Sequence, residues 1–158
     1  MTFEEFAQTM KKTKEDAQKE AEARQKRQEE EISIMLADII HKVVPVADII
    51  SRYGTCFLWT HSHNLHEKRF SVEKGYIIIA DGSQRLTIGK KDGSAEAHLS
   101  YHNEKCRKLS LQYEIVDAAQ KLLDEYGDAI LEKAVEWCRM QNEEDRSERD
   151  STFVVSLA

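Results

Sequence analysis

Histidine is the residue type in this chain best suited to metal or acid–base chemistry, and five of the six histidines lie between residues 55 and 108. His61 and His63 are two apart, so on a strand they would share a face and could chelate one cation. His98 and His102 are four apart and can share a face on a strand or a helix. These four residues are the metal candidates, provided that the first and last strands of the segment meet.

The same histidines offer a second kind of chemistry, the hydrolysis of phosphoesters. Enzymes of that kind place two His-x-Ser/Thr motifs opposite each other, so that each imidazole transfers a proton across the phosphate. Only His98-Leu99-Ser100 matches this motif cleanly. The chain also lacks a glycine-rich phosphate loop and a nucleophile elbow, so no catalytic motif is complete, and we expect neither an enzyme nor a cofactor.

Basic and aromatic side chains alternate through residues 55–108, which hold nine Lys/Arg against six Asp/Glu. Basic residues beside aromatic residues on a sheet can hold phosphates and stack bases. This pattern makes nucleic-acid binding by a basic face of the sheet one hypothesis. The candidate binding residues are Arg69, Lys74, Arg85, Lys90, Lys91 and Trp59.

The C-terminal third has the opposite charge balance, with five Lys/Arg against twelve Asp/Glu in residues 109–158. A net charge of −6 argues against general coating of nucleic acid by the whole surface. A chain with one basic and one acidic part can pair with its own copy, so a homodimer is the expected state.

The length of 158 residues fits one core domain, and no apolar run is long enough to span a membrane. The N-terminus has no apolar signal core. The three cysteines form no CxxC pair. We therefore expect a cytoplasmic protein with reduced thiols and no membrane partner.

Helical periodicity dominates the first 54 residues. Residues 1–31 predict a charged N-terminal helix or arm, apolar mainly at Phe3, Phe6 and Met10. An amphipathic helix is expected over residues 32–44, and Pro45 is expected to end or kink it. A short second helix over residues 46–53 should stop at Gly54.

The period then changes to that of strands, which we expect near residues 56–61, 68–73, 76–80, 85–89 and 95–101. Asp81-Gly82 is a strong hairpin signal, and the short loops predict an antiparallel meander of four to five strands.

Two further helices are predicted, over residues 109–126 and from Asp128 to residue 141, separated by Gly127. The fold class expected is therefore α+β: N-terminal helices, the meander, then two C-terminal helices packed on the sheet. The core domain should span residues 32–141. Residues 142–158 should form a flexible acidic tail with a short apolar peptide that adds to a sheet edge or docks on another chain.

One local resemblance accompanies these patterns. VADIISRYG at residues 46–54, His63-Asn64 and Phe70-Ser71-Val72 together resemble the start of the zinc ribbon of bacterial DNA primases. Thr60 stands at that family's first cysteine, and Ile78 and Asp81 stand near its later pair, so of the ligands only His63 is retained. The resemblance implies a metal-free segment that touches DNA, and it assigns no family.

These observations favour a non-catalytic protein-interaction module, a small regulator or inhibitor that acts through surface charge on a protein partner and self-associates. A nucleic-acid-binding protein is the alternative, and a His-site metal protein or phosphoesterase is the second alternative.

Overall fold

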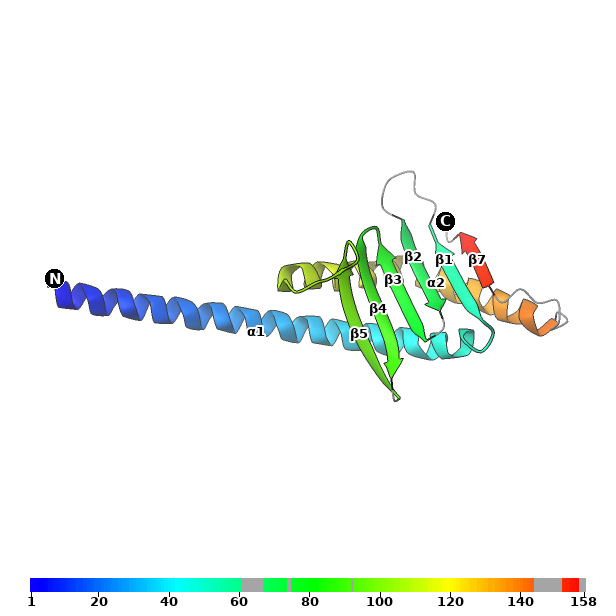
Figure 1. Cartoon of the computed structure of the whole chain (residues 1–158), viewed down its shortest axis with the longest axis horizontal. Helices are drawn as coiled ribbons and strands as arrows, with labels where there is room; N and C mark the ends of the chain where they lie inside the picture. The colour runs from blue at the N-terminus through cyan, green and yellow to red at the C-terminus, as the bar shows by residue number, and fades with distance from the viewer. Residues whose placement is uncertain (61–66, 74, 92, 144–151, 157–158) are drawn as a thin grey trace.

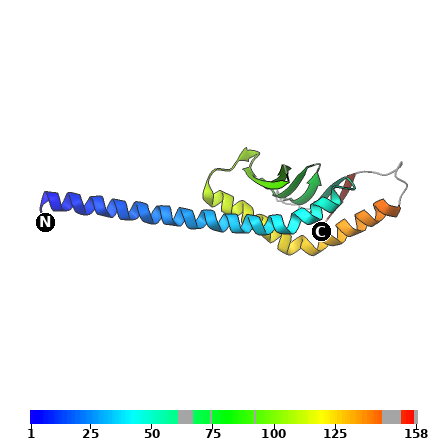
Figure 2. The same ribbon diagram turned by 90° about the horizontal axis from the view of Figure 1, so that it is seen from below.

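The computed structural model describes residues 1–60, 67–73, 75–91, 93–143 and 152–156. Its fold is α+β, with a long N-terminal helix, a mainly antiparallel sheet and a long C-terminal helix. The sheet lies in front of the helices in Figure 1, and the turned view in Figure 2 places both helices on the same side of it. The body therefore has one layer of helices and one layer of sheet.

Helix α1 spans Phe3–Ile50 and starts at a capping box. The Thr2 hydroxyl accepts a hydrogen bond from the Glu5 backbone N–H at 3.1 Å, and the Glu5 carboxylate accepts one from the Thr2 N–H at 3.1 Å. These bonds satisfy two of the donors that a helix start leaves unpaired.

The sequence predicted that Pro45 would end or kink the helix and that a short second helix would follow, and the prediction of a separate second helix was wrong. Pro45 lies inside α1, which bends near its C-terminal end (Figure 2). Val43, before the proline, and Ala47 and Ile50, after it, are all buried. Burial of one continuous apolar stripe thus holds the helix together where proline removes a backbone hydrogen bond.

The meander follows as five main strands and a short sixth. They are β1 (Thr55–Trp59), β2 (Lys68–Glu73), β3 (Tyr76–Asp81), β4 (Gln84–Lys91), β5 (Ser94–Tyr101) and β6 (Glu104–Lys105). The predicted hairpin at Asp81-Gly82 is present, with Gly82 at a φ of 58°. A further turn, which the sequence did not signal, places His102 and Asn103 at φ of 51° and 66° between β5 and β6.

Helix α2 spans Leu109–Glu143 without a break at Gly127, so the two predicted C-terminal helices are one. Buried residues on both sides of the glycine, from Ile115 and Leu122 to Ile130 and Trp137, keep the helical spacing. Trp137 is 1% exposed and packs edge-on against Tyr53, with ring centroids 6.2 Å apart.

The last strand, β7 (Thr152–Ser156), pairs in parallel with β1, as Figure 1 shows beside the C-terminus. The seven strands lie in the order β6-β5-β4-β3-β2-β1-β7. The sequence counted four or five strands because β6 has only two residues and β7 lies beyond the acidic segment. Residues 144–151 and 157–158 of the segment expected to be a flexible tail lie outside the described residues.

Candidate interaction surface

Strand pairing divides the sheet residues between two faces, because successive side chains on a strand point to opposite sides. Leu58, Phe70, Ile79, Leu86 and Leu99 are paired across β1 to β5, and they belong to the core beneath the helices. The alternate residues form the other side of the sheet, which no described helix covers. We call that side the open face.

A row of cations crosses the open face. Arg69 pairs with Ala80, Ala80 with Arg85, Arg85 with Ser100, and Ser100 with Lys105. Arg69, Arg85 and Lys105 therefore lie on alternate strands about 10 Å apart, separated by small residues. We call these three residues the cationic row. Trp59 pairs with Arg69 and so holds the next position of this row on β1.

Arg69 is the best-defined member of the cationic row. Its guanidinium lies over the Phe57 ring, 5.9 Å from the centroid, a cation–π contact. Its Nε is buried, has no hydrogen-bond partner among the described residues, and Arg69 forms no ion pair with a described carboxylate. Within the described structure, the Arg69 charge is therefore not neutralised.

The next row contains small, apolar and weakly polar side chains. We call it the middle row: Phe57, Ser71, Ile78, Thr87 and His98. Ser71 is fully buried, with no hydrogen-bond partner for its hydroxyl among the described residues, and Ile78 is 8% exposed. Thr87 is half-buried and His98 is exposed, with its Nε2 3.8 Å from the Glu96 carboxylate.

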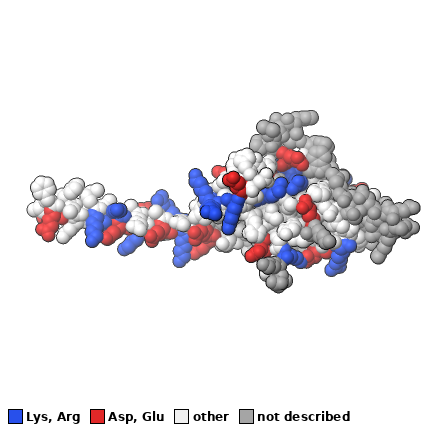
Figure 3. Space-filling view, in the orientation of Figure 1, with Lys and Arg blue, Asp and Glu red and all other residues white. Residues whose placement is uncertain are grey.

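Carboxylates occupy the third row. Glu73 pairs with Tyr76, Tyr76 with Gly89, and Gly89 with Glu96, and we call these four residues the acidic row. Tyr76 is 55% exposed, and its ring lies over Gly89, where an added Cβ would meet it at 3.5 Å. The open face thus has cations on one side of a weakly polar centre and carboxylates on the other, and Figure 3 shows both signs on this side of the molecule.

The structure brings together only part of the predicted binding set. Arg69 and Arg85 share the open face with the position of Trp59, whereas Lys90 lies on the helix-facing side and forms an ion pair with Asp48 of α1. Lys74, and the side chains of Lys91 and Trp59, lie outside the described residues. The sequence prediction missed the carboxylates of this face, Glu73 and Glu96, although strand parity would have assigned Glu73 to the side that carries Arg69.

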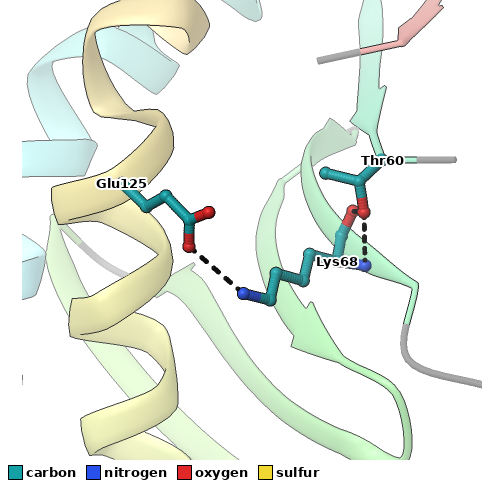
Figure 4. Close-up of polar contacts among 3 residues, drawn as sticks. All are labelled: Thr60, Lys68 and Glu125. Atoms are coloured by element: carbon teal, nitrogen blue, oxygen red, sulfur yellow. Dashed lines mark hydrogen bonds and ion pairs between the residues drawn. The ribbon is translucent and has the colours of Figure 1, made fainter. Parts of the chain in front are cut away.

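Lys68 is also neutralised by a helix. Its Nζ lies 3.3 Å from the Glu125 carboxylate of α2 and 5.8 Å from the centre of the Tyr126 ring. Figure 4 shows this pair beside Thr60, whose hydroxyl accepts a hydrogen bond from the Lys68 backbone N–H at 3.1 Å. Thr60 thus closes the end of the β1–β2 pairing.

The histidine candidates do not form a site in the described structure. His61 and His63 lie outside the described residues, so the metal and phosphoesterase alternatives stay predictions. His98 lies in the middle row, and His102 occupies the β5–β6 turn, where its ring packs against Tyr101. Among the described residues, no three His, Cys, Asp or Glu side chains are grouped to hold a metal ion.

Comparison with known protein families, curated proteins and solved structures found no match to this chain. Neither α1 nor α2, the helices that the structure describes, has a stretch apolar enough to cross a bilayer.

Proposed function

We propose that this chain is a non-catalytic protein-interaction module: a small regulator that binds a protein partner through its N-terminal helix and self-associates through surface charge. The observation that carries the proposal is the N-terminal part of α1, residues 3–31, which extends about 43 Å and projects away from the body (Figure 1). We call it the arm. An isolated helix in water has little stability without packing, so the arm gains its stability on a partner.

The apolar side chains of the arm are concentrated near its tip. Every residue of the arm is exposed except Gln28, which is half-buried. Phe3 is 97% exposed, Phe6 56% and Met10 51%, and the three share one face of the helix. Exposed aromatic and methionine side chains on one helical face are typical of a helix that docks in a groove.

This apolar face continues the buried stripe of the same helix. Phe3, Ala21 and Ile39 are spaced by about five helical turns each, so they lie at the same angle around the axis, and Ile39 is fully buried. A groove of about 460 Å³ marks the point where the stripe leaves the body, between Ile32 and Leu36 of α1 and Leu109 of α2. A partner lying along the arm would therefore continue the packing of the core.

Capture of a partner from cell lysate tests the proposal, with variants at the apolar tip of the arm. Replacing Phe3, Phe6 and Met10 by serine should abolish retention of the partner, because the variant loses the apolar docking face and keeps the charges. The matched control replaces Gln8, Lys12 and Glu15, on the opposite face of the arm, by serine and should retain the partner. If the intact protein retains nothing and is a strict monomer by light scattering, the proposed function is wrong.

The cationic row favours one second candidate, nucleic-acid binding. Three cations on alternate strands, with Trp59 at the end of the row, can contact phosphates of a single strand. The acidic row on the same face opposes such binding. This candidate requires that the protein bind a labelled oligonucleotide at low salt and release it steeply as salt rises.

A further inference from the structure

We infer that the open face packs against the open face of a second copy of this chain, forming a two-fold symmetric dimer. The inference rests on the self-association in the proposed function and assigns it to a surface separate from the arm. Its starting point is the order of the three rows, which places opposite charges at equal distances on either side of the middle row.

The dimer follows from placing the two-fold axis between the two sheets, along the middle row. This rotation keeps each strand above its own copy and reverses its direction. The cationic row of one copy then lies over the acidic row of the other, as an isologous interface requires. Arg69 of each copy lies opposite Glu73 of the second copy, both on β2, and this contact occurs twice.

The remaining charges also find partners in this arrangement. Arg85 lies one strand away from Glu96 of the second copy, and Lys105 lies one strand away from the same Glu96 on the other side. Adjacent strands are about 4.8 Å apart and packed sheets about 10 Å apart, distances that arginine and glutamate side chains can bridge. A twist of about 30° between the sheets is normal for aligned packing and preserves the charge pairing near the centre.

The middle row supplies the centre of the interface. Under the same rotation positions 57, 78 and 87 lie opposite their own copies; Thr87 is half-buried, Ile78 is 8% exposed, and the Arg69 guanidinium lies over the Phe57 ring. Five strands at about 4.8 Å and six residues at about 3.4 Å give a footprint of about 500 Å² per copy. The total of about 1,000 Å² reaches the size expected of a specific interface of the weaker kind.

The state of Arg69 supports a carboxylate partner. A buried guanidinium Nε without a hydrogen bond is unfavourable, and a carboxylate can accept from Nε and a terminal nitrogen together. Glu73 of a second copy would supply that acceptor. A nucleic-acid strand would satisfy Arg69 but would bring its phosphates toward Glu73 and Glu96, so charge complementarity favours the second copy.

A charge swap tests the inference. Light scattering and sedimentation equilibrium should show a dimer for the intact protein. Arg69→Glu and Glu73→Arg should each weaken dimerisation about 100-fold, because each variant creates two like-charge contacts per dimer. The double variant Arg69→Glu/Glu73→Arg should recover dimerisation to within about tenfold of the intact protein, because the pairs re-form with reversed signs. Circular dichroism confirms folding of each variant.

The control applies the same changes away from the open face, as Arg139→Glu and Glu132→Arg, at exposed positions of α2. These variants should dimerise like the intact protein. A monomer, or a dimer unaffected by the reversals at Arg69 and Glu73, overturns the inference. So does a dimer that the serine substitutions at Phe3, Phe6 and Met10 disrupt while the reversals do not. If the protein is a monomer that still retains a partner through the arm, the inference and the self-association are both wrong, and the proposed partner binding stands.

Oligonucleotide binding tests the other possible occupant of the open face, a nucleic-acid strand. If the protein binds a labelled single strand at low salt, and Glu73→Arg strengthens that binding while the protein is monomeric, the open face is a nucleic-acid surface and the inference is wrong.

Discussion

Cys56 shows how burial alone sets the chemistry of a single residue. It is fully buried on the helix-facing side of β1, and desolvation, with a smaller contribution from Cys138, raises the pKa of the Cys56 thiol to about 12. The thiol therefore stays neutral at a pH where the thiolate, the reactive form, appears in the unfolded chain. Cys56 is a core residue and no nucleophile at neutral pH.

The raised pKa of Cys56 predicts a loss of stability in alkali. The unfolded thiol ionises above about pH 8.5 and the folded thiol only near 12, so the unfolded state binds fewer protons in between. The free energy of unfolding should fall there by at most about 1.4 kcal/mol per pH unit from this group. Urea unfolding at several pH values measures it, and Cys56→Ala should flatten the slope. An equal slope in both proteins would contradict the prediction.

The alternation of side chains between the two faces of a strand decides how much of the surface could be predicted from the sequence. Once the strands near residues 68–73 and 85–89 are assigned, alternation places Arg69 and Arg85 away from the core and Lys90 toward the helices. The sequence could not show that Asp48 and Glu125, each more than 40 positions away, neutralise Lys90 and Lys68. Local charge counts therefore overstate the basic character of the sheet, because ion pairs form across layers.

At the scale of elements, the glycine-containing turns were predictable, and the continuity of the two helices was not. Gly75, Gly82 and Gly93 have positive φ, a requirement that glycine signals in the sequence. Pro45 and Gly127 signal breaks equally strongly, yet both lie inside helices. Packing of long apolar stripes against the sheet overrides a local preference of about 1 kcal/mol for glycine and about 3 kcal/mol for proline.

Gly127 therefore lowers the stability of α2 through the low helix propensity of glycine, and a substitution can remove this cost. A Cβ added there meets no heavy atom within 4 Å, because Gly127 lines a cleft of about 400 Å³ between α1 and α2. Gly127→Ala should raise the free energy of unfolding by about 1 kcal/mol, the difference in helix propensity. Urea unfolding measures it, and Ala129→Gly, two residues along the same helix, should lower it by a similar amount. A destabilised Gly127→Ala protein would contradict this expectation.

At the scale of the whole molecule, the two edges of the sheet differ. One edge ends in β6, which has two residues, and very short edge strands resist pairing with other chains. At the other side of the sheet, β7 comes from the far end of the sequence, pairs with β1 over five residues and forms the edge strand. The C-terminal segment therefore covers the edge that β1 would otherwise present.

Removing β7 should thus lower the stability of the protein and change its unfolding rate. Truncation after Glu143 should lower the free energy of unfolding by about 1 to 3 kcal/mol. The loss should appear mainly as faster unfolding, because β7 joins segments about 100 residues apart and such contacts form late in folding. Stopped-flow unfolding and refolding measure both rates.

Replacing residues 152–156 by a glycine–serine peptide is the control and should behave like the truncation, since it retains chain length but not strand propensity. If refolding slows instead, β7 forms early, and the parallel pairing with β1 is part of the folding nucleus.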